Sequence, residues 1–92
     1  MTKEEVIRLT NKVFEKDFEI AADRLKPEAQ IFNDLGLDSL DIVDLVVALQ
    51  KQFSVTIRDD ERVRNIRTLG DVYDFIYLLG QEGHSGGVKG TV

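Results

Sequence analysis

Apolar residues recur at helical spacing in three separate stretches of this chain, and this periodicity is the strongest constraint on its fold. The first stretch follows Thr2 and Glu5, which have the spacing of a capping box, and predicts a helix over residues 3–15. The last stretch follows Thr68 and Asp71, which repeat that spacing, and predicts a helix that ends at Gly80. The residues expected to face the core are Val6, Ile7, Leu9, Thr10, Val13 and Phe14 in the first stretch and Leu69, Val72, Tyr73, Ile76 and Leu79 in the last.

The central stretch predicts a second helix that begins at Asp38 or Ser39, both good N-cap residues, and runs to Phe53. Asp41 adds negative charge to the first turn, where the helix dipole favours it. Steps of about 100° per residue give this helix a core face, which consists of Ile42, Leu45, Val46, Leu49 and Phe53. With its three periodic stretches, the chain is therefore predicted to be all-helical.

Two apolar residues of this second helix, Leu40 and Val47, fall on the side opposite the core face and flank Asp44. Exposed apolar residues with nothing to bury against are often left for a partner. Scattered surface residues, or contacts with the preceding loop, would give the same pattern. Both interpretations stay open at this point.

The segments between the periodic stretches are expected to be irregular apart from one short helix. The connection over residues 16–38 is long for a compact domain and delivers the chain to Ser39. Its apolar residues should pin it to the core; they are Phe18, Ile20, Leu25, Ile31, Phe32, Leu35 and Leu37. Residues 59–65 predict a short third helix with Val63 and Ile66 pointing inward. Residues 81–92 are glycine-rich and predict a flexible tail after one folded domain over residues 1–80.

Ser39 lies where a turn runs into the second helix, and the sequence offers nothing to activate its hydroxyl. A serine nucleophile needs an adjacent base, and the only histidine, His84, lies in the glycine-rich tail. The serine therefore suggests an attachment point, and no enzymatic activity is expected. The chain has no cysteine, so any thiol chemistry must be imported.

The charge of the chain is unevenly distributed. The formal net charge is -5 over 92 residues, which argues against nucleic acid as a partner. Residues 27–50 hold five acidic residues and no basic one, a local charge of -5 around Ser39. Residues 51–67 hold five basic residues against three acidic ones, a local charge of +2. The result is a dipolar surface, although two ordinary solvated faces would have the same composition.

The acidic residues around Ser39 do not match a calcium loop. Placing Gly36 at the turn position of an EF-hand puts Ile31 at the first ligand position and Ile42 at the last. Asp38, Asp41 and Asp44 form a ridge that could hold a cation loosely, but a solvated helix face explains the ridge equally well, and no metal site is predicted. The polar N-terminus lacks a secretory signal and no apolar run is long enough to span a membrane, so cytoplasmic residence is expected.

The segment from Asp34 to Leu45, with the sequence DLGLDSLDIVDL, resembles the modification motif of acyl carrier proteins. The resemblance continues through Phe53, Ile57 and Asp59 and through the segment over residues 66–72 to the end of the last helix. It implies an all-α, four-helix bundle with a short third helix and a long loop between its first two helices. By the same resemblance, Ser39 carries a 4'-phosphopantetheine arm, which a phosphopantetheinyl transferase attaches from coenzyme A.

The resemblance also implies the function and the partners. A monomeric carrier would hold acyl groups as thioesters and shuttle them between a loading ligase or transferase, ketosynthase-type enzymes and other synthases of fatty acid, polyketide or related lipid biosynthesis. Its docking residues would be Asp38, Leu40, Asp41, Asp44, Val47 and Ile57. The acidic ones would speed the encounter with basic partners more than they raise affinity.

The chain departs from the family pattern after the motif. Gln50, Lys51 and Gln52 stand where a fatty-acid carrier has a run of glutamates, and Arg58 replaces a common proline. The region of the third helix is basic, with Arg62, Arg64 and Arg67. These changes suggest a specialised carrier that serves its own synthase or ligase, unless they are drift at solvated positions. The alternative function is an unmodified helical interaction module, in which alanine at position 39 would make no difference.

Overall fold

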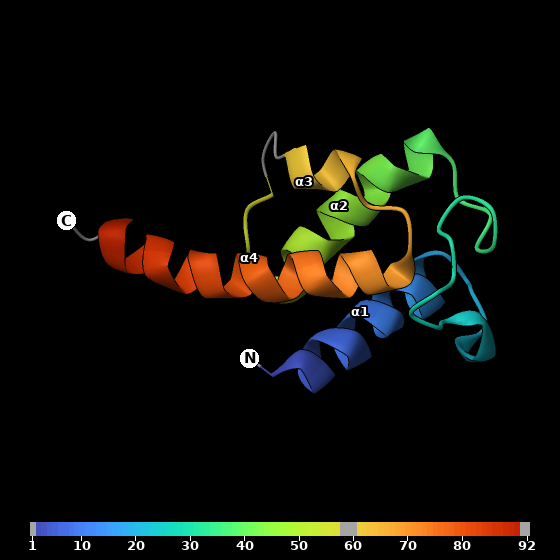
Figure 1. Ribbon diagram of the computed structural model, residues 1–92, viewed down its shortest axis with the longest axis horizontal. Helices are drawn as coiled ribbons and strands as arrows, with labels where there is room; N and C mark the ends of the chain where they lie inside the picture. Colours follow the sequence, from blue (N-terminus) through green and yellow to red (C-terminus); the bar gives the residue numbers. More distant parts are fainter. Residues whose placement is uncertain (1, 58–60, 91–92) are drawn as a thin grey trace.

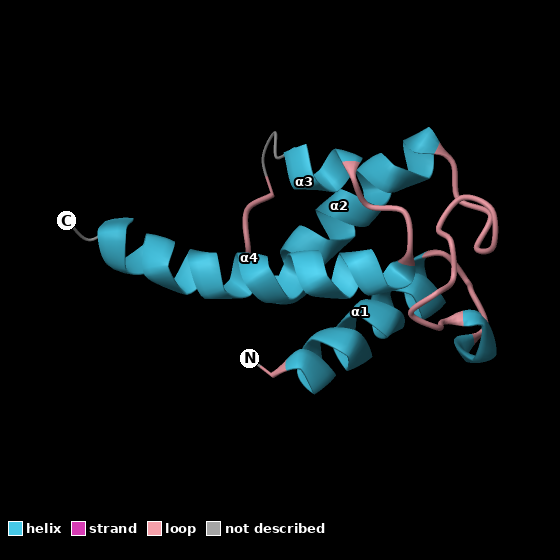
Figure 2. Ribbon diagram, in the orientation of Figure 1, coloured by secondary structure: helices cyan, strands magenta, loops and turns pink. Residues whose placement is uncertain are grey.

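The fold is all-helical, as the periodicity predicts (Figures 1 and 2). The structure is a computed structural model that describes residues 2–57 and 61–90, and only the backbone of residues 61, 62 and 82–90. Its elements are α1 (Lys3–Asp17), the 3-10 helix η1 (Ala22–Arg24), α2 (Ser39–Phe53), α3 (Glu61–Arg64) and α4 (Leu69–Gly90). These described segments contain no strand, only an isolated bridge between Gln30 and Thr68. Because α3 is a single turn, the count of four helices stays a prediction.

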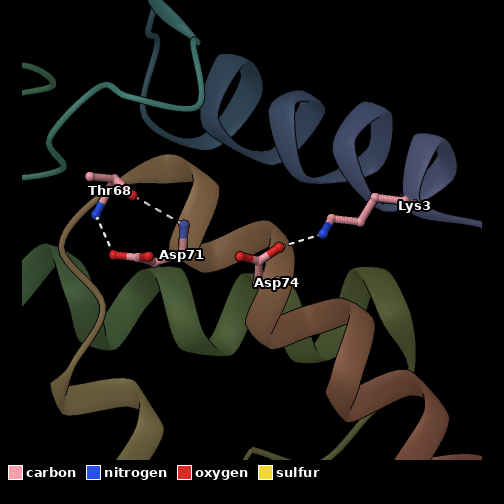
Figure 3. A network of polar contacts seen from close by, with 4 residues as sticks. All are labelled: Lys3, Thr68, Asp71 and Asp74. Atoms are coloured by element: carbon pink, nitrogen blue, oxygen red, sulfur yellow. Dashed lines mark hydrogen bonds and ion pairs between the residues drawn. The ribbon is translucent and has the colours of Figure 1, made fainter.

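Helix α1 packs against both α2 and α4 (Figure 1). Its predicted capping box is confirmed: the Glu5 N–H donates to the Thr2 hydroxyl at 3.1 Å, and the Glu5 carboxylate accepts from the Thr2 N–H at 3.3 Å. An ion pair between Lys3 and Asp74 joins α1 to α4 (Figure 3). The predicted core residues of α1 are buried or half-buried, and the helix extends two residues beyond the expected Glu15, to Asp17.

The long connection after α1 is held to the start of α4 by its backbone. The Ile31 N–H donates to the Arg67 carbonyl at 2.9 Å, and the Leu69 N–H donates to the Ala29 carbonyl at 2.9 Å. The expected apolar anchors are buried at Ile20, Leu25, Ile31, Leu35 and Leu37 and half-buried at Phe18. The expectation that Phe32 joins them was wrong, because its side chain is 47% exposed. Phe32 instead lies at the rim of a cavity described below.

After α2 the chain turns at Ser54, which has a left-handed backbone, and α3 then follows. No strand forms over residues 54–57, in agreement with the prediction. The predicted short helix is present as Glu61–Arg64, while its expected beginning at Asp59 lies outside the described residues. Val63 and Ile66 are half-buried and pack against the core, as expected.

Helix α4 is longer than the sequence suggested. Its start is confirmed: the Asp71 N–H donates to the Thr68 hydroxyl at 3.2 Å, and the Asp71 carboxylate accepts from the Thr68 N–H at 3.1 Å (Figure 3). The predicted end at Gly80 was wrong, because the helix continues to Gly90 and Gly80 has no positive φ. Glycine permits a left-handed stop but does not require one, and within a helix it costs only about 1 kcal/mol relative to alanine. That residues 81–92 act as a flexible tail stays a prediction, and residues 91–92 lie outside the described part.

The core lies between α1, α2, α4 and the long connection. Its fully buried side chains include Val6, Phe14, Ile31, Leu69 and Ile76. Phe75 is buried as well, although it had not been expected on the core face of the last helix. Within residues 2–57 and 61–90, no helix has the length and apolar character needed to cross a membrane.

Candidate functional site

The first turn of α2 is fixed by two aspartates that cap it. Asp38 is the N-cap: its Oδ1 accepts from the N–H of Leu40 at 2.9 Å and from the N–H of Asp41 at 3.0 Å. The Asp41 carboxylate in turn accepts from the Asp38 N–H at 3.0 Å. Of the two predicted starting points, Asp38 is therefore the cap and Ser39 is the first residue of the helix.

The turn before Ser39 is anchored on both sides of a glycine. Leu35 and Leu37 are buried, and Gly36 between them has a φ of 73°. A side chain is strained at such a φ, which explains why glycine occupies this position. The turn therefore enters α2 at a defined angle and leaves Ser39 exposed.

The groups described next to Ser39 in the sequence are the two carboxylates of the helix cap. The neighbouring carboxylates of Asp38 and Asp41 accept backbone N–H groups of the cap and so are already engaged. The side chain of His84 lies outside the described residues. Throughout the described ranges, no group of three histidine or acidic side chains could hold a metal ion. Ser39 is exposed to solvent beside the two carboxylates.

An apolar cavity of about 250 Å³ opens beside Ser39. It lies between α2, α3 and α4, and Phe32 contributes from the preceding loop. Its lining consists of Phe32, Ser39, Ile42, Leu45, Val46, Leu49, Ile57, Val63, Arg64, Ile66, Val72 and Phe75. Ten of these twelve side chains are apolar, so the cavity is suited to a hydrocarbon ligand.

The exposed face of α2 carries the apolar residues that the periodicity placed there. Leu40 is 77% exposed and Val47 is 43% exposed. Val43, which the sequence analysis missed, is 61% exposed between them. The signal was present, because a residue three after Leu40 and four before Val47 shares their face of a helix.

The acidic residues and Ile57 are distributed differently. Asp38 at the N-cap and Asp44 within α2 are exposed, while Asp41 in the first turn is half-buried. Ile57 is only 8% exposed and lines the cavity, and its N–H donates to the Gln50 side chain at 2.7 Å. The structure therefore brings Ile57 to the cavity and not to the exposed apolar face. Its docking role stays a prediction that this burial does not favour.

Two groups with perturbed pKa values lie away from Ser39, at helix contacts. The backbone N–H groups of Arg67 and Thr68 donate to Asp71 and hold the pKa of its carboxyl below the ordinary value. Figure 3 shows the contact with Thr68. Burial raises the pKa of Tyr73, whose hydroxyl donates to the Asn11 side chain. Both groups lie on α4, and neither lines the cavity beside Ser39.

Comparison with known proteins agrees with this geometry. Residues 11–76 match the family model described as the phosphopantetheine attachment site. Acyl carrier protein 2 of Ralstonia nicotianae is 39% identical over 79 residues, which cover 86% of this chain and 96% of that protein. The acyl carrier protein of Acidothermus cellulolyticus is 37% identical over 76 residues, which cover 83% of this chain and 89% of that protein.

A solved structure of the acyl carrier protein from Enterococcus faecalis has a similar fold. The TM-score is 0.68 at 33% sequence identity, and the match covers 86% of this chain and 99% of that one. Fold, sequence and family model therefore agree over most of the chain. The chain belongs to the acyl carrier protein family and carries acyl groups on a covalently attached 4'-phosphopantetheine.

Proposed function

We propose that Ser39 is the residue to which the 4'-phosphopantetheine arm is attached. Of the hydroxyl side chains that the structure describes, Ser39 is the one that lines the apolar cavity, and it is exposed at the first residue of α2. Thr68 accepts the N–H of Asp71 in a helix cap, and Ser54 lies at the opposite end of α2. The position of Ser39 beside the cavity is the observation that carries the proposal.

The site fits the arm in its exposure and its open space. A phosphodiester at Ser39 would project from an exposed helix start, and the attached chain would have an apolar cavity beside it. The arm supplies the thiol for a thioester, which this cysteine-free chain does not have. A simple helix N-terminus binds an anion through free backbone N–H groups. At the start of α2, the N–H groups of Leu40 and Asp41 already donate to Asp38.

The cavity supports an apolar cargo that is partly sheltered by the protein. Its apolar lining would remove an acyl chain from water, and about 25 cal/mol is gained per Å² of apolar surface buried. Val63 and Ile66 border it from α3 and the residues that follow, and both are only half-buried. Small movements of α3 would therefore admit a chain without disturbing α1.

Partner enzymes would dock on the exposed face of α2. The apolar side chains of Leu40, Val43 and Val47 supply contact area, and the exposed carboxylates of Asp38 and Asp44 attract basic surfaces. The partners in this proposal are the phosphopantetheinyl transferase, a loading ligase or transferase, and ketosynthase-type enzymes. Lys51 and Gln52, at exposed positions late in α2, interrupt the acidic character and favour a dedicated synthase or ligase.

Family members are carriers and not catalysts. This chain too would carry acyl groups without catalysing their reactions. It would act as a monomer in the cytoplasm, with α3 as the third helix of a four-helix bundle. Turnover of acyl thioesters by the isolated chain, above the rate for the Ser39→Ala variant, would contradict the absence of catalysis.

Labelling with a fluorescent coenzyme A derivative tests the attachment site. The parent chain, Ser39→Ala and Ser54→Ala are incubated with a broad-specificity phosphopantetheinyl transferase and separated on a denaturing gel. We expect labelling of the parent and of Ser54→Ala and none of Ser39→Ala, with helical circular dichroism unchanged in all three. Equal labelling of Ser39→Ala would place the arm elsewhere. An absence of labelling in all three, beside a labelled control carrier, would favour the unmodified interaction module.

A further inference from the structure

Arg64 is the one charged side chain among the described residues that line the cavity beside Ser39. It is the last residue of α3, and it is exposed. Ser39 is exposed on the same lining. The fold therefore brings a cation from α3 and the start of α2 to the lining of one cavity, although 25 positions separate them in the sequence.

The segment around Ser39 offers no cation of its own. Residues 27–50 contain five acidic residues and no lysine or arginine. Asp38 precedes Ser39 directly and is exposed, and Asp41 follows two positions later. A phosphodiester attached to Ser39 would add another negative charge to this surface, and like charges this close repel one another.

The backbone at the start of α2 gives little compensation. The N–H groups of Leu40 and Asp41 would be the usual anion donors of a helix N-terminus. Both already donate to the Asp38 carboxylate, at 2.9 Å and 3.0 Å. The Ile42 N–H donates to the Asp38 carbonyl at 3.1 Å, within the helix. A basic side chain from another element would therefore add compensation that these three N–H groups do not give.

We propose that Arg64 binds the phosphodiester of the arm and acts as a positioning residue for it. A guanidinium group matches phosphate oxygens in a two-point hydrogen-bonded geometry and stays ionised at any physiological pH. The contact would hold the first part of the arm against α3, across the opening of the cavity. This inference rests on the proposed attachment at Ser39.

The test compares unmodified and phosphopantetheinylated forms of the parent, Arg64→Gln, Arg64→Lys and Arg67→Gln. Arg67 is a matched control, because it is exposed and only three positions away but does not line the cavity. The melting temperature is measured for both forms of each protein, so that the effect of the arm is separated from the effect of the substitution. The ³¹P chemical shift of the phosphodiester is recorded for each modified form.

We expect attachment of the arm to lower the melting temperature more in Arg64→Gln than in the parent, by roughly 2–6 °C. Arg64→Lys should recover part of this difference, and Arg67→Gln should behave as the parent does. The difference should shrink in about 1 M salt, where charges are screened over about 3 Å. The ³¹P resonance should move in Arg64→Gln and not in Arg67→Gln.

Equal effects of the arm in the parent, Arg64→Gln and Arg67→Gln, with one common ³¹P shift, would overturn the role of Arg64. Such a result would leave the attachment at Ser39 intact, because the modified proteins would have formed. Failure of the transferase to modify any of the four proteins would instead contradict the proposed attachment, and the role of Arg64 with it.

Discussion

Asp38 and Asp41 cap the start of α2 reciprocally, each carboxylate accepting the backbone N–H of the other at 3.0 Å. Ser39 lies between them, so the residue proposed to carry the arm is held by the same hydrogen bonds that begin the helix. The two aspartates thus have a structural role that is separate from any attraction of basic partners. The stability of substituted proteins should therefore distinguish the two cap aspartates from Asp44, which lies on the exposed face of α2.

Replacing the cap tests this structural role. Asp38→Ala removes the acceptor for two N–H groups and should lower the free energy of unfolding by about 1 kcal/mol. Asp38→Asn keeps an acceptor oxygen and should retain most of the stability while losing the charge. Urea denaturation measures both, with Asp44→Ala as the matched control on the exposed face. Equal stability of Asp38→Ala and Asp44→Ala would show that the cap contributes nothing.

Alanine substitutions at the exposed and at the buried residues proposed for docking should differ in their effect on the free energy of unfolding. Leu40→Ala and Val47→Ala are expected to change the free energy of unfolding by less than about 0.5 kcal/mol, because neither side chain is part of the buried core. Ile57→Ala should cost about 2–5 kcal/mol, because its side chain is buried beside the cavity.

The rate of modification by the transferase is the second measurement on these variants. Leu40→Ala and Val47→Ala should slow it, and Leu78→Ala should not, since Leu78 is an exposed apolar residue on α4. Unchanged rates in the α2 variants would contradict docking on this face. Full stability of Ile57→Ala would contradict its assignment to the core.

The cavity predicts that an apolar cargo stabilises the modified protein. Hexanoyl, octanoyl and decanoyl forms should melt at higher temperatures than the form with a free thiol, because the chain leaves water. Val63→Phe adds volume to the lining and should reduce this gain, while Val47→Phe, on the exposed face, should not. Calorimetry of each form provides the melting temperatures. If the acyl chain raises the melting temperature equally in both variants, the chain lies in solvent or elsewhere on the surface.

Acidification should weaken the cap of α4. The N–H groups of Arg67 and Thr68 hold the pKa of Asp71 below its ordinary value of 3.8. A carboxyl whose pKa is lower in the folded state stabilises the fold above the unfolded-state pKa, and this contribution is lost as the pH falls through the folded-state value. Asp71→Asn should therefore be less stable than the parent at neutral pH, with a gap that narrows below about pH 4.

Urea denaturation at several acidic pH values measures the difference in the free energy of unfolding between the parent and Asp71→Asn. Asp44→Asn is the control, because it removes an exposed carboxylate elsewhere on the molecule and should not reproduce the narrowing. A gap between the parent and Asp71→Asn that stays constant with pH would rule out a stabilising role for the ionised carboxyl.

The helix starts were predictable from the sequence because their causes are local. Thr2 with Glu5, and Thr68 with Asp71, form caps between residues three positions apart, and no tertiary contact is needed to recognise them. The position of Ser39 at the start of α2 followed from the same reasoning. The exposed face of α2 was predictable from periodicity, although Val43 was overlooked.

The parts that the sequence did not reveal depend on contacts between distant segments. Ile57 is buried through packing near α2 and a hydrogen bond to Gln50, and nothing in its immediate neighbours indicates this. Phe32 is apolar like the anchors of its loop, yet the fold leaves it at the rim of the cavity. The placement of Arg64 on the same lining as Ser39 likewise follows only from the way α3 packs.

The intact mass of the chain after incubation with coenzyme A and a broad-specificity phosphopantetheinyl transferase tests the attachment of the arm at Ser39 most directly. Peptide mapping of the product and the Ser39→Ala variant complete the experiment. We expect a gain of one phosphopantetheinyl group, located on Ser39 and absent from the variant. An unchanged mass beside a modified control carrier, or an adduct on any other residue, would contradict attachment at Ser39.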